Sequence, residues 1–390
     1  RVGDEPLDLK QYGLIGWVYG HYHSQHHHVR GLVSNICTGT PGGGCISSDA
    51  AGLRCIDVTD VGLVSELLYF TAPTDSASEA VWRAKLNGRV GFCELASYQG
   101  DIIAATTDDG YPSACGVYRL DSHTGEIVWR VAADAGIKNN VVVDADRVYA
   151  QDARGGVYCI EADSGRLTWK RSLCLRRADY TTAPVLVAED VVIVGSNRSI
   201  SALSVENGDL VWEANNLKAY NGNTHARYVY DRANDQIIVG PQWQSLIALD
   251  RRTGEKRWEN AEGALWFRNC TPTLSDGVLY TAGGNEVIAV DATTGQILRT
   301  NKLDMNFNVC GGPCVCGDTV YYPTAKHGVA ALDRDTLELR RCYPTAPAAL
   351  FTSPYVGNED DVQMVESRPQ VVGDTLLFTA MDGRLYFYYK

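Results

Sequence analysis

Several features that define large classes of protein are missing from this sequence. No run of Lys and Arg is longer than two or three residues and the formal net charge is −12, so the surface would repel a phosphate backbone. No apolar stretch approaches the ~18 residues that a helix needs to cross a bilayer. No segment keeps a 3.6-residue apolar period for long. We therefore expect no nucleic-acid partner, no membrane span and an all-β fold.

The start of the chain and its cysteines also lack a familiar pattern. The first residue is Arg1, with no initiator Met and no apolar core of a signal peptide, so we expect a processed product or a fragment of a longer protein. The 12 cysteines follow no regular framework. Cys310, Cys314 and Cys316 form a tight cluster, but no second pair of zinc ligands accompanies them. Buried thiols are the favoured interpretation.

A repeated turn sequence is the strongest positive signal. Its glycine position recurs at steps of 40, 43, 46, 41 and 42 residues, at Gly125, Gly165, Gly208, Gly254, Gly295 and, in a decayed copy, Leu337. A period of about 40 to 50 residues is typical of a β-propeller blade or a related array. The Thr-Gly step supplies the left-handed residue of a tight hairpin, and the preceding Asp or Glu can bond the amides of the turn.

The segments around each turn predict strands and blade contacts. Runs such as Val148–Gln151 and Val191–Val194 suit strands. Four copies carry a Trp four residues after the Gly, which predicts wedges between neighbouring blades: Trp129, Trp169, Trp212 and Trp258. Inner strand pairs are expected near Ile102, Val148, Val191, Ile237, Val278, Val320 and Leu376. The sequence thus predicts a seven-bladed β-propeller of four-stranded blades.

The last unit ends before its outer strand. A strand of the outer type, Ala80–Ala84 with Trp82, lies instead near the start of the array. We expect it to complete the last blade, which would remove free sheet edges.

These repeats resemble the PQQ-like, or quinoprotein-type, propeller family over about residues 65 to 390. The resemblance implies a propeller, in a family that contains both quinone-dependent dehydrogenases and cofactor-free scaffolds. The chain has no adjacent Cys-Cys pair and no Cys-x-x-Cys-His for a c-type haem, which argues against bound PQQ. The resemblance also favours a periplasmic or secreted location.

The first sixty residues have a different character. An apolar run ends in Gly-His-x-His at Gly20–His23, and a Gly-rich loop and the expected strand Gly52–Val58 follow. This pattern resembles the last motif of the calcineurin-like metallophosphoesterases. The resemblance implies that His21 and His23 are metal ligands, one for each of two divalent ions. A pair of turn histidines without a metal is the alternative. His26–His28 cannot all converge on one face of a strand, so surface or partly buried positions are expected there.

The upstream motifs of that family cannot fit into the twenty residues before His21. We therefore expect residues 1–62 to be the C-terminal remnant of a truncated α/β phosphoesterase domain, and 63–390 to be the propeller. An upstream phosphoesterase domain would complete the dinuclear site. Taken alone, this chain holds no complete set of catalytic residues.

A candidate binding face lies where the inner strands begin. Polar or aromatic residues recur just before these strands and include Asn140, Tyr180, His225, Arg227, Trp266, Arg268, Asn308 and Arg368. Convergence of the cationic members would make a positive patch suited to a phosphate or carboxylate. The alternative is that these side chains cap strand ends and satisfy backbone groups.

Two functional hypotheses follow. The leading one is the C-terminal region of a metal-dependent phosphoesterase whose propeller binds a phosphoester substrate or a protein partner. The alternative is a non-catalytic propeller scaffold that binds protein or polysaccharide. Whether this chain belongs to an enzyme stays open at this stage.

Overall fold

The computed structural model describes residues 13–20, 26–30, 33–38, 52–69, 84, 86, 95–106, 115–173, 181, 183–196, 199–215, 227–240, 246–260, 270–307, 311–346, 365, 367–380 and 385–390. Every regular element among these residues is a β-strand. The all-β prediction is therefore confirmed. Within these ranges no helix has the length and apolar character that crossing a membrane requires.

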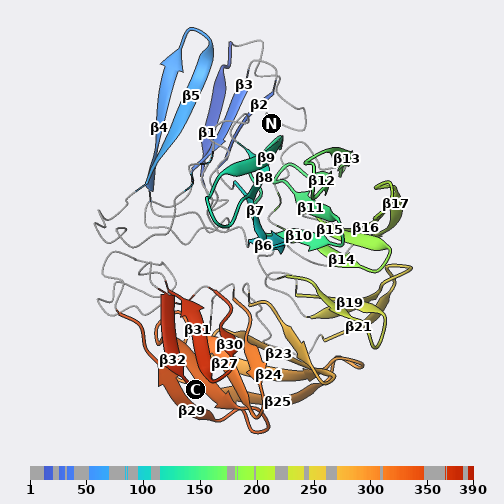
Figure 1. The fold of residues 1–390 in the computed structure, drawn as a ribbon, viewed down its shortest axis with the longest axis vertical. Helices are drawn as coiled ribbons and strands as arrows, with labels where there is room; N and C mark the ends of the chain where they lie inside the picture. Colours follow the sequence, from blue (N-terminus) through green and yellow to red (C-terminus); the bar gives the residue numbers. More distant parts are fainter. Residues whose placement is uncertain are drawn as a thin grey trace, which may run out of the picture.

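Two small sheets form a front unit, drawn in blue in Figure 1. The first has the strand order β1 (Gly16–Tyr19), β3 (Val33–Cys37), β2 (His26–Arg30), with β1 parallel and β2 antiparallel to β3. The second is the antiparallel hairpin of β4 (Gly52–Thr59) and β5 (Gly62–Tyr69). Leu63 packs directly on Gly16, where an added Cβ would overlap the Leu63 side chain. The hairpin therefore packs across the three-stranded sheet.

A buried polar contact joins these two sheets. His27 is 7% exposed, and its Nδ1 lies 2.9 Å from the hydroxyl of Ser65. Arg54 donates to the same hydroxyl at 2.8 Å. Surface or partly buried positions were the expectation for His26–His28, so the burial of His27 corrects it. The reason is that a strand alternates its side chains, and His27 falls on the face that the hairpin covers.

Seven further sheets follow in chain order. Sheet 1 contains β6 (Ala96–Tyr98), β7 (Asp101–Ala105), β8 (Gly116–Leu120) and β9 (Ile127–Ala132). Sheet 2 contains β10 (Val141–Asp144), β11 (Arg147–Gln151), β12 (Gly156–Glu161) and β13 (Leu167–Ser172). Sheet 3 contains β14 (Leu186–Ala188), β15 (Val191–Gly195), β16 (Ser199–Ser204) and β17 (Leu210–Asn215). Sheets 4 and 5 contain β18 (Val229–Asp231), β19 (Gln236–Val239), β20 (Ile247–Asp250), β21 (Lys256–Glu259); β22 (Thr273–Ser275), β23 (Val278–Gly283), β24 (Glu286–Asp291), β25 (Ile297–Lys302). Sheets 6 and 7 contain β26 (Cys314–Cys316), β27 (Thr319–Pro323), β28 (Val329–Asp333), β29 (Leu339–Tyr343); β30 (Gln370–Val372), β31 (Thr375–Thr379), β32 (Leu385–Tyr389).

Each sheet is an antiparallel meander, and sheets 1 to 6 have four strands while sheet 7 has three among the described residues. The first strands of consecutive sheets contact one another, from β6 through β10, β14, β18, β22 and β26 to β30. Figure 1 shows the sheets following one another around an arc, from teal through green and yellow to red. All seven inner strand pairs lie where the repeat predicted them.

The middle strands are buried on both faces. In sheet 3, every residue of β15 and the first five residues of β16 are buried, so burial does not alternate along either strand. This differs from a half-buried strand because sheet 3 is covered by sheet 2 on one side and by sheet 4 on the other. The core is therefore a series of clusters between consecutive sheets.

The Trp side chains lock one sheet to the next. The indole N–H of Trp212 donates to the carbonyl of Arg251 at 2.7 Å, and a Cβ added at Gly254 would overlap the Trp212 ring. The same arrangement joins Trp129 to Ala162 and Gly165, Trp169 to Val205 and Gly208, and Trp258 to Ala292 and Gly295. The predicted wedge role is confirmed for these four Trp residues. The turn glycines Gly165, Gly208, Gly254 and Gly295 have a second function, because each makes room for a Trp ring.

We expect a double-mutant cycle to measure this lock. Trp212→Ala should lower the free energy of unfolding by about 3 to 5 kcal/mol, because it removes a buried aromatic ring and its hydrogen bond. Gly254→Ala should destabilise by steric overlap with Trp212 and by the φ of 71° at this position. Urea unfolding of both single variants and the double variant gives the coupling between them.

Gly277→Ala is the matched control, since Gly277 has a φ of 75° and nothing within 4 Å of an added Cβ. Gly254→Ala should cost more than Gly277→Ala in the wild-type background and about the same in the Trp212→Ala background. Equal costs in both backgrounds would show that the ring does not press on the turn.

Candidate functional site

The array has two faces, defined by where its strands end. In sheets 1 to 6 the turns between the first and second strands and between the third and fourth strands leave at one end, which we call the turn face. The turn between the second and third strands, and the connection to the next sheet, leave at the opposite end, which we call the connection face. The described candidates Asn140, Arg227 and Arg368 precede the first strands of sheets 2, 4 and 7, and so belong to the connection face.

The repeated Asp organises the turn between the third and fourth strands in sheets 1, 4, 5 and 6. The Oδ1 atom of Asp121 accepts the N–H groups of His123 and Thr124 at 2.9 and 2.7 Å, and Gly125 has a φ of 75°. Asp250, Asp291 and Asp333 accept the equivalent pairs of amides. The turn chemistry predicted from the sequence is confirmed.

These hydrogen bonds favour the ionised carboxylates. The amide of Thr336 and the guanidinium of Arg340 lower the pKa of Asp333 to about 2. At Asp250, desolvation acts in the opposite direction, but Arg257 and the turn amides prevail and the pKa is also lowered to about 2. The turn carboxylates therefore serve the turns themselves.

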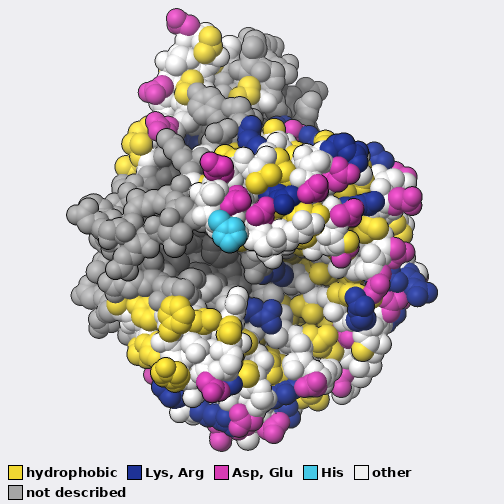
Figure 2. Space-filling model, viewed as in Figure 1, with side chains coloured by type: hydrophobic (Ala, Val, Ile, Leu, Met, Phe, Trp, Pro, Cys, Tyr) yellow, Lys and Arg dark blue, Asp and Glu magenta, His cyan; other side chains and the backbone are white. Residues whose placement is uncertain are grey.

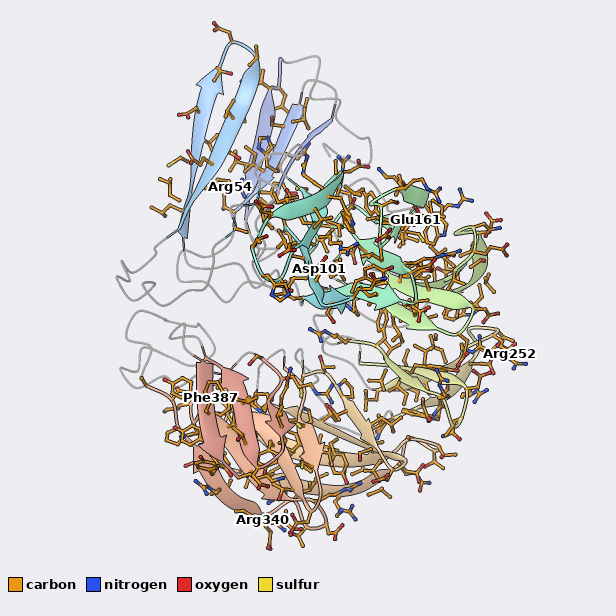
Figure 3. The ribbon with its side chains drawn as sticks, in the orientation of Figure 1. Arg54, Asp101, Glu161, Arg252, Arg340 and Phe387 are labelled. Atoms are coloured by element: carbon orange, nitrogen blue, oxygen red, sulfur yellow. The ribbon has the colours of Figure 1, made fainter. Side chains whose placement is uncertain are left out.

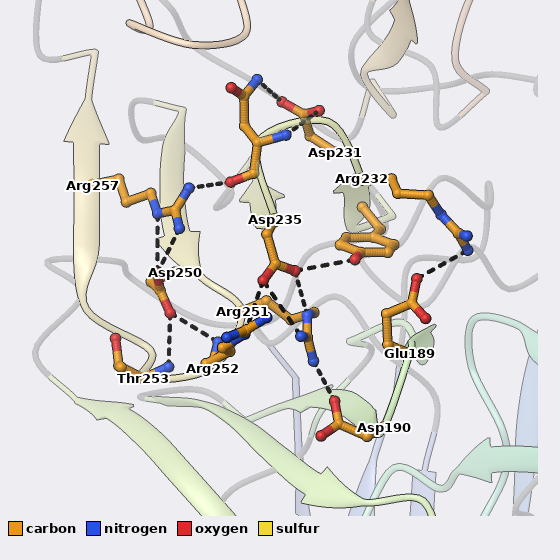
Figure 4. Close-up of polar contacts among 12 residues, drawn as sticks. Glu189, Asp190, Asp231, Arg232, Asp235, Asp250, Arg251, Arg252, Thr253 and Arg257 are labelled. Atoms are coloured by element: carbon orange, nitrogen blue, oxygen red, sulfur yellow. Dashed lines mark hydrogen bonds and ion pairs between the residues drawn. The ribbon is translucent and has the colours of Figure 1, made fainter.

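A cluster of ion pairs links sheets 3 and 4 on the same face (Figure 4). Arg251 is 6% exposed and binds both Asp190 of sheet 3 and Asp235 of sheet 4. The hydrogen bond to Asp235 raises the pKa of Arg251, in spite of desolvation. Arg252 binds Asp235 as well, at 3.1 Å. Arg251 was missed by sequence reasoning, and its place directly after the turn residue Asp250 is the signal that could have found it.

Equivalent arginines hold other sheets together. Arg334 of sheet 6 reaches Asp276 of sheet 5 at 2.6 Å and the hydroxyl of Tyr280 at 3.1 Å. Arg119 of sheet 1 binds Asp101 at 2.7 Å and Asp163 of sheet 2 at 3.2 Å. Figure 3 labels Asp101 beside the inner strands, and Arg252 and Arg340 at the outer rim. Charges of the turn face are thus largely paired within the molecule.

Asn140 is the candidate residue whose role the structure describes most fully. It is 6% exposed, its Nδ2 donates to the carbonyl of Val185 at 2.9 Å, and its Oδ1 accepts the N–H of Val185 at 2.9 Å. Gln151 makes the same two-sided contact with the backbone of Gly195. Both side chains fasten sheet 2 to sheet 3, which corresponds to the capping alternative for Asn140.

Two cationic candidates are also described on the connection face. Arg227 lies two residues before β18, is half-buried, and its N–H donates to the hydroxyl of Thr271 in sheet 5 at 3.1 Å. Arg368 lies two residues before β30 and is exposed. Lys138, near the start of sheet 2, is buried at 1% exposure. These residues begin sheets 2, 4 and 7, so they are distributed around the array.

The remaining candidates lie outside the described residues. They are His21, His23, Tyr180, His225, Trp266, Arg268 and Asn308. Trp82, expected to close the last sheet, and Cys310 lie outside as well. Their predicted roles stay predictions.

Metal-ligating side chains were sought throughout the described ranges. In that part of the chain, no three His, Cys, Asp or Glu side chains are grouped so that they could hold a metal ion. Cys314 and Cys316 are half-buried on β26, and burial raises the pKa of the Cys314 thiol. Figure 2 shows positive and negative side chains interspersed over the visible rim of the array.

The sequence matches the family described as outer membrane protein assembly factor BamB over residues 113–338 and 244–388. The chain is 26% identical over 293 residues to the BamB protein of Bordetella pertussis, covering 71% of this chain and 73% of that relative. The BamB relatives of Moranella endobia, Burkholderia pseudomallei and Yersinia pestis are covered over 42%, 45% and 59% of their length.

Solved structures show the same fold. BamB from Moraxella catarrhalis has a TM-score of 0.54 at 18% identity, over 76% of this chain and 96% of that chain. The computationally designed Ika8 protein has a TM-score of 0.53 at 14% identity, over 79% and 99%. A europium-containing methanol dehydrogenase has a TM-score of 0.57 at 14% identity, over 79% and 80%.

The repeats and their Trp–Gly contacts define a β-propeller of PQQ-like repeats, as the sequence predicted. Within that class, the chain belongs to the BamB family of outer membrane protein assembly factors.

This membership contradicts the leading hypothesis of a metal-dependent phosphoesterase, since the BamB relatives are outer membrane protein assembly factors. It favours the scaffold alternative. The error came from Gly-His-x-His, because a four-residue motif after a strand can arise without a metal centre.

We expect the lowered carboxylate pKa values to make stability fall in acid. A carboxylate with a pKa of 3.8 when unfolded and about 2 when folded stabilises the protein above pH 4, and this contribution is lost as the pH falls from about 4 to about 2. Melting temperatures by circular dichroism across this range measure the loss.

Asp333→Asn is the informative variant, because the amide oxygen can still accept the two turn N–H groups but cannot titrate. Its melting temperature should fall less steeply than that of the wild type below pH 4. An identical slope would show that Asp333 does not contribute to the acid sensitivity.

Proposed function

We propose that this chain is a non-catalytic propeller scaffold that binds a protein partner in the assembly of outer membrane proteins. Membership of the BamB family carries this proposal. The paired charges of the turn face and the backbone-bound Asn140 support it, because they give a rigid body rather than a set of reactive groups. A rigid scaffold loses little conformational entropy when it binds. A periplasmic location accords with this role.

We further propose that the array is a closed ring of seven blades. In the described sheets each Trp lies under the turn glycine of the following sheet, and Gly125 of sheet 1 has the same turn geometry. Trp82 precedes Gly125 at a comparable distance in sequence. We assign its segment, Ala80–Ala84, to the free edge of β32 as the fourth strand of sheet 7.

The domain boundary follows from the same assignment. β5 (Gly62–Tyr69) pairs with β4 and not with a strand of the array. We therefore place the end of the front unit after Tyr69, rather than at the boundary of 62 and 63 that the sequence suggested.

Ring closure can be tested by stability. Trp82→Ala should lower the melting temperature about as much as Trp212→Ala, since both would remove one lock between sheets. Trp17→Ala is the control, because Trp17 is 51% exposed on the front unit and should change little. A Trp82→Ala variant that melts like the wild type would contradict the closure.

The scaffold role can be tested by partner capture. The immobilised chain should retain a specific protein from a cell-envelope extract, identified by cross-linking and mass spectrometry, and the purified pair should bind in a defined ratio. The Ika8 propeller serves as a bait of the same fold and should not retain that protein. If the chain retains no protein, or binds envelope polysaccharide instead, the proposed function is wrong.

A further inference from the structure

The outer strands of the array are its exposed edges. β9, β13, β17, β21, β25 and β29 each pair with one strand alone among the described residues. Such edges invite pairing with another chain, and proteins usually block them with charge, above all lysine, or with bulges. Each of these strands has a register shift near its start, so the bulge does not distinguish them.

Charge does distinguish them. Five of the six strands carry at least one positive side chain, namely Arg130 in β9, Lys170 and Arg171 in β13, Lys256 and Arg257 in β21, Arg299 and Lys302 in β25, and Arg340 and Arg341 in β29. β17, with the sequence LVWEAN, carries none. The edge of sheet 3 therefore lacks the positive charge that the equivalent edges have.

β17 also exposes apolar surface. Leu210 is 60% exposed and Val211 is 49% exposed, side by side at the register shift opposite Leu203. Leu210 is more exposed than Ile127 and Leu167, which occupy the same position in β9 and β13 at 44% and 42%. Trp212 is buried and its indole N–H donates to the carbonyl of Arg251 in sheet 4, so β17 is fixed in position by the neighbouring sheet.

The surroundings of this edge are acidic. Asp209 and Glu206 precede β17 in the turn, and Glu213 is exposed within it. Arg171 of sheet 2 pairs with Asp209 at 2.6 Å, and Glu213 accepts the hydroxyl of Ser199 and the amide of Asn215. The guanidinium of Arg147 is also near, since it donates to the carbonyl of Val205 at 2.6 Å. Three carboxylates and two guanidinium groups leave a net negative charge beside this edge. Figure 1 places β17 at the outer rim of the array, away from the front unit.

We propose that the edge of β17 is a docking site for an extended protein segment whose side chains alternate between apolar and basic. The segment adds a fifth strand to sheet 3: its backbone pairs with the free N–H and C=O groups of β17, and its apolar side chains cover Leu210 and Val211. Its basic side chains face Glu206, Asp209 and Glu213, which gives the charge complementarity. This proposal rests on the scaffold function proposed above and names the site that serves it.

A labelled peptide of about eight residues that alternates valine and lysine is the probe. Fluorescence anisotropy should show binding to the wild-type chain. The variant L210K/V211K adds the charges that the other edges have, and it should weaken binding by about tenfold or more, the effect of about 1.4 kcal/mol. A peptide that alternates valine and glutamate should bind far more weakly.

The matched control is I127K/V128K in β9, where the two side chains are 44% and 50% exposed and an arginine is already present. It should bind the valine–lysine peptide as the wild type does. No binding to the wild type, or an equal loss in both variants, would overturn the proposal. Circular dichroism should show that both variants keep the wild-type fold, since all four side chains are exposed.

The two proposals can fail separately. If the wild-type chain retains a protein partner and L210K/V211K retains it equally well, the docking site is wrong and the scaffold function stands. If no partner is retained although the peptide binds at β17, the scaffold function is wrong and the edge remains a strand acceptor.

Discussion

The contact on which the rest of the structure depends is the one between a Trp of one sheet and the turn glycine of the next. An indole ring fills the space that a Cβ at Gly254 would take, and its N–H satisfies a backbone carbonyl of the same turn. The glycine thus allows the tight hairpin turn, and the Trp fixes the position of one sheet against the next. Because the contact repeats from sheet to sheet, the array is rigid without any helix or disulfide among its described residues. Between sheets 5 and 6, Arg299 and Leu337 occupy the equivalent sequence positions. Leu337 still adopts the left-handed φ of 60°, and the side-chain amide of Asn301 donates to its carbonyl at 2.9 Å.

The same constraint decides which groups remain for binding. Two arginines that come directly after a turn Asp lie between neighbouring sheets. Arg251 and Arg334 each form an ion pair with a carboxylate of the preceding sheet. The side-chain amide of Asn140, just before β10, also joins two sheets, because it donates to the backbone carbonyl of Val185. Among the polar candidates of the sequence, the Asn140 side chain is therefore committed to holding two sheets together. Among the described residues, the outer strand of each of sheets 1 to 6 pairs with one strand alone, and these strands differ in charge and exposure.

The period of the repeats predicted the sheets, their order and the role of the Trp residues, because both turn geometry and blade packing impose residue types locally. Function was harder to predict. The motif at Gly20–His23 pointed to a phosphoesterase, but two histidines after a strand are a small part of a metal centre, and the family membership contradicts that function. Asn140 had two possible roles that the sequence could not separate, since its partner Val185 is 45 residues away.

By itself the sequence determined the strands, the hairpin turns and the class of fold, because a tight turn needs a left-handed residue, preceded in most copies by an Asp or Glu, at defined positions whatever surrounds it. Only the tertiary structure decided which side chains are shared between sheets. Arg251 bridges two carboxylates that lie 61 and 16 residues away in sequence, so its place after Asp250 could single it out but could not identify the carboxylates that it binds. The exposure of Leu210 was likewise decided by packing, since it depends on what lies beside the strand and not on the residues within it.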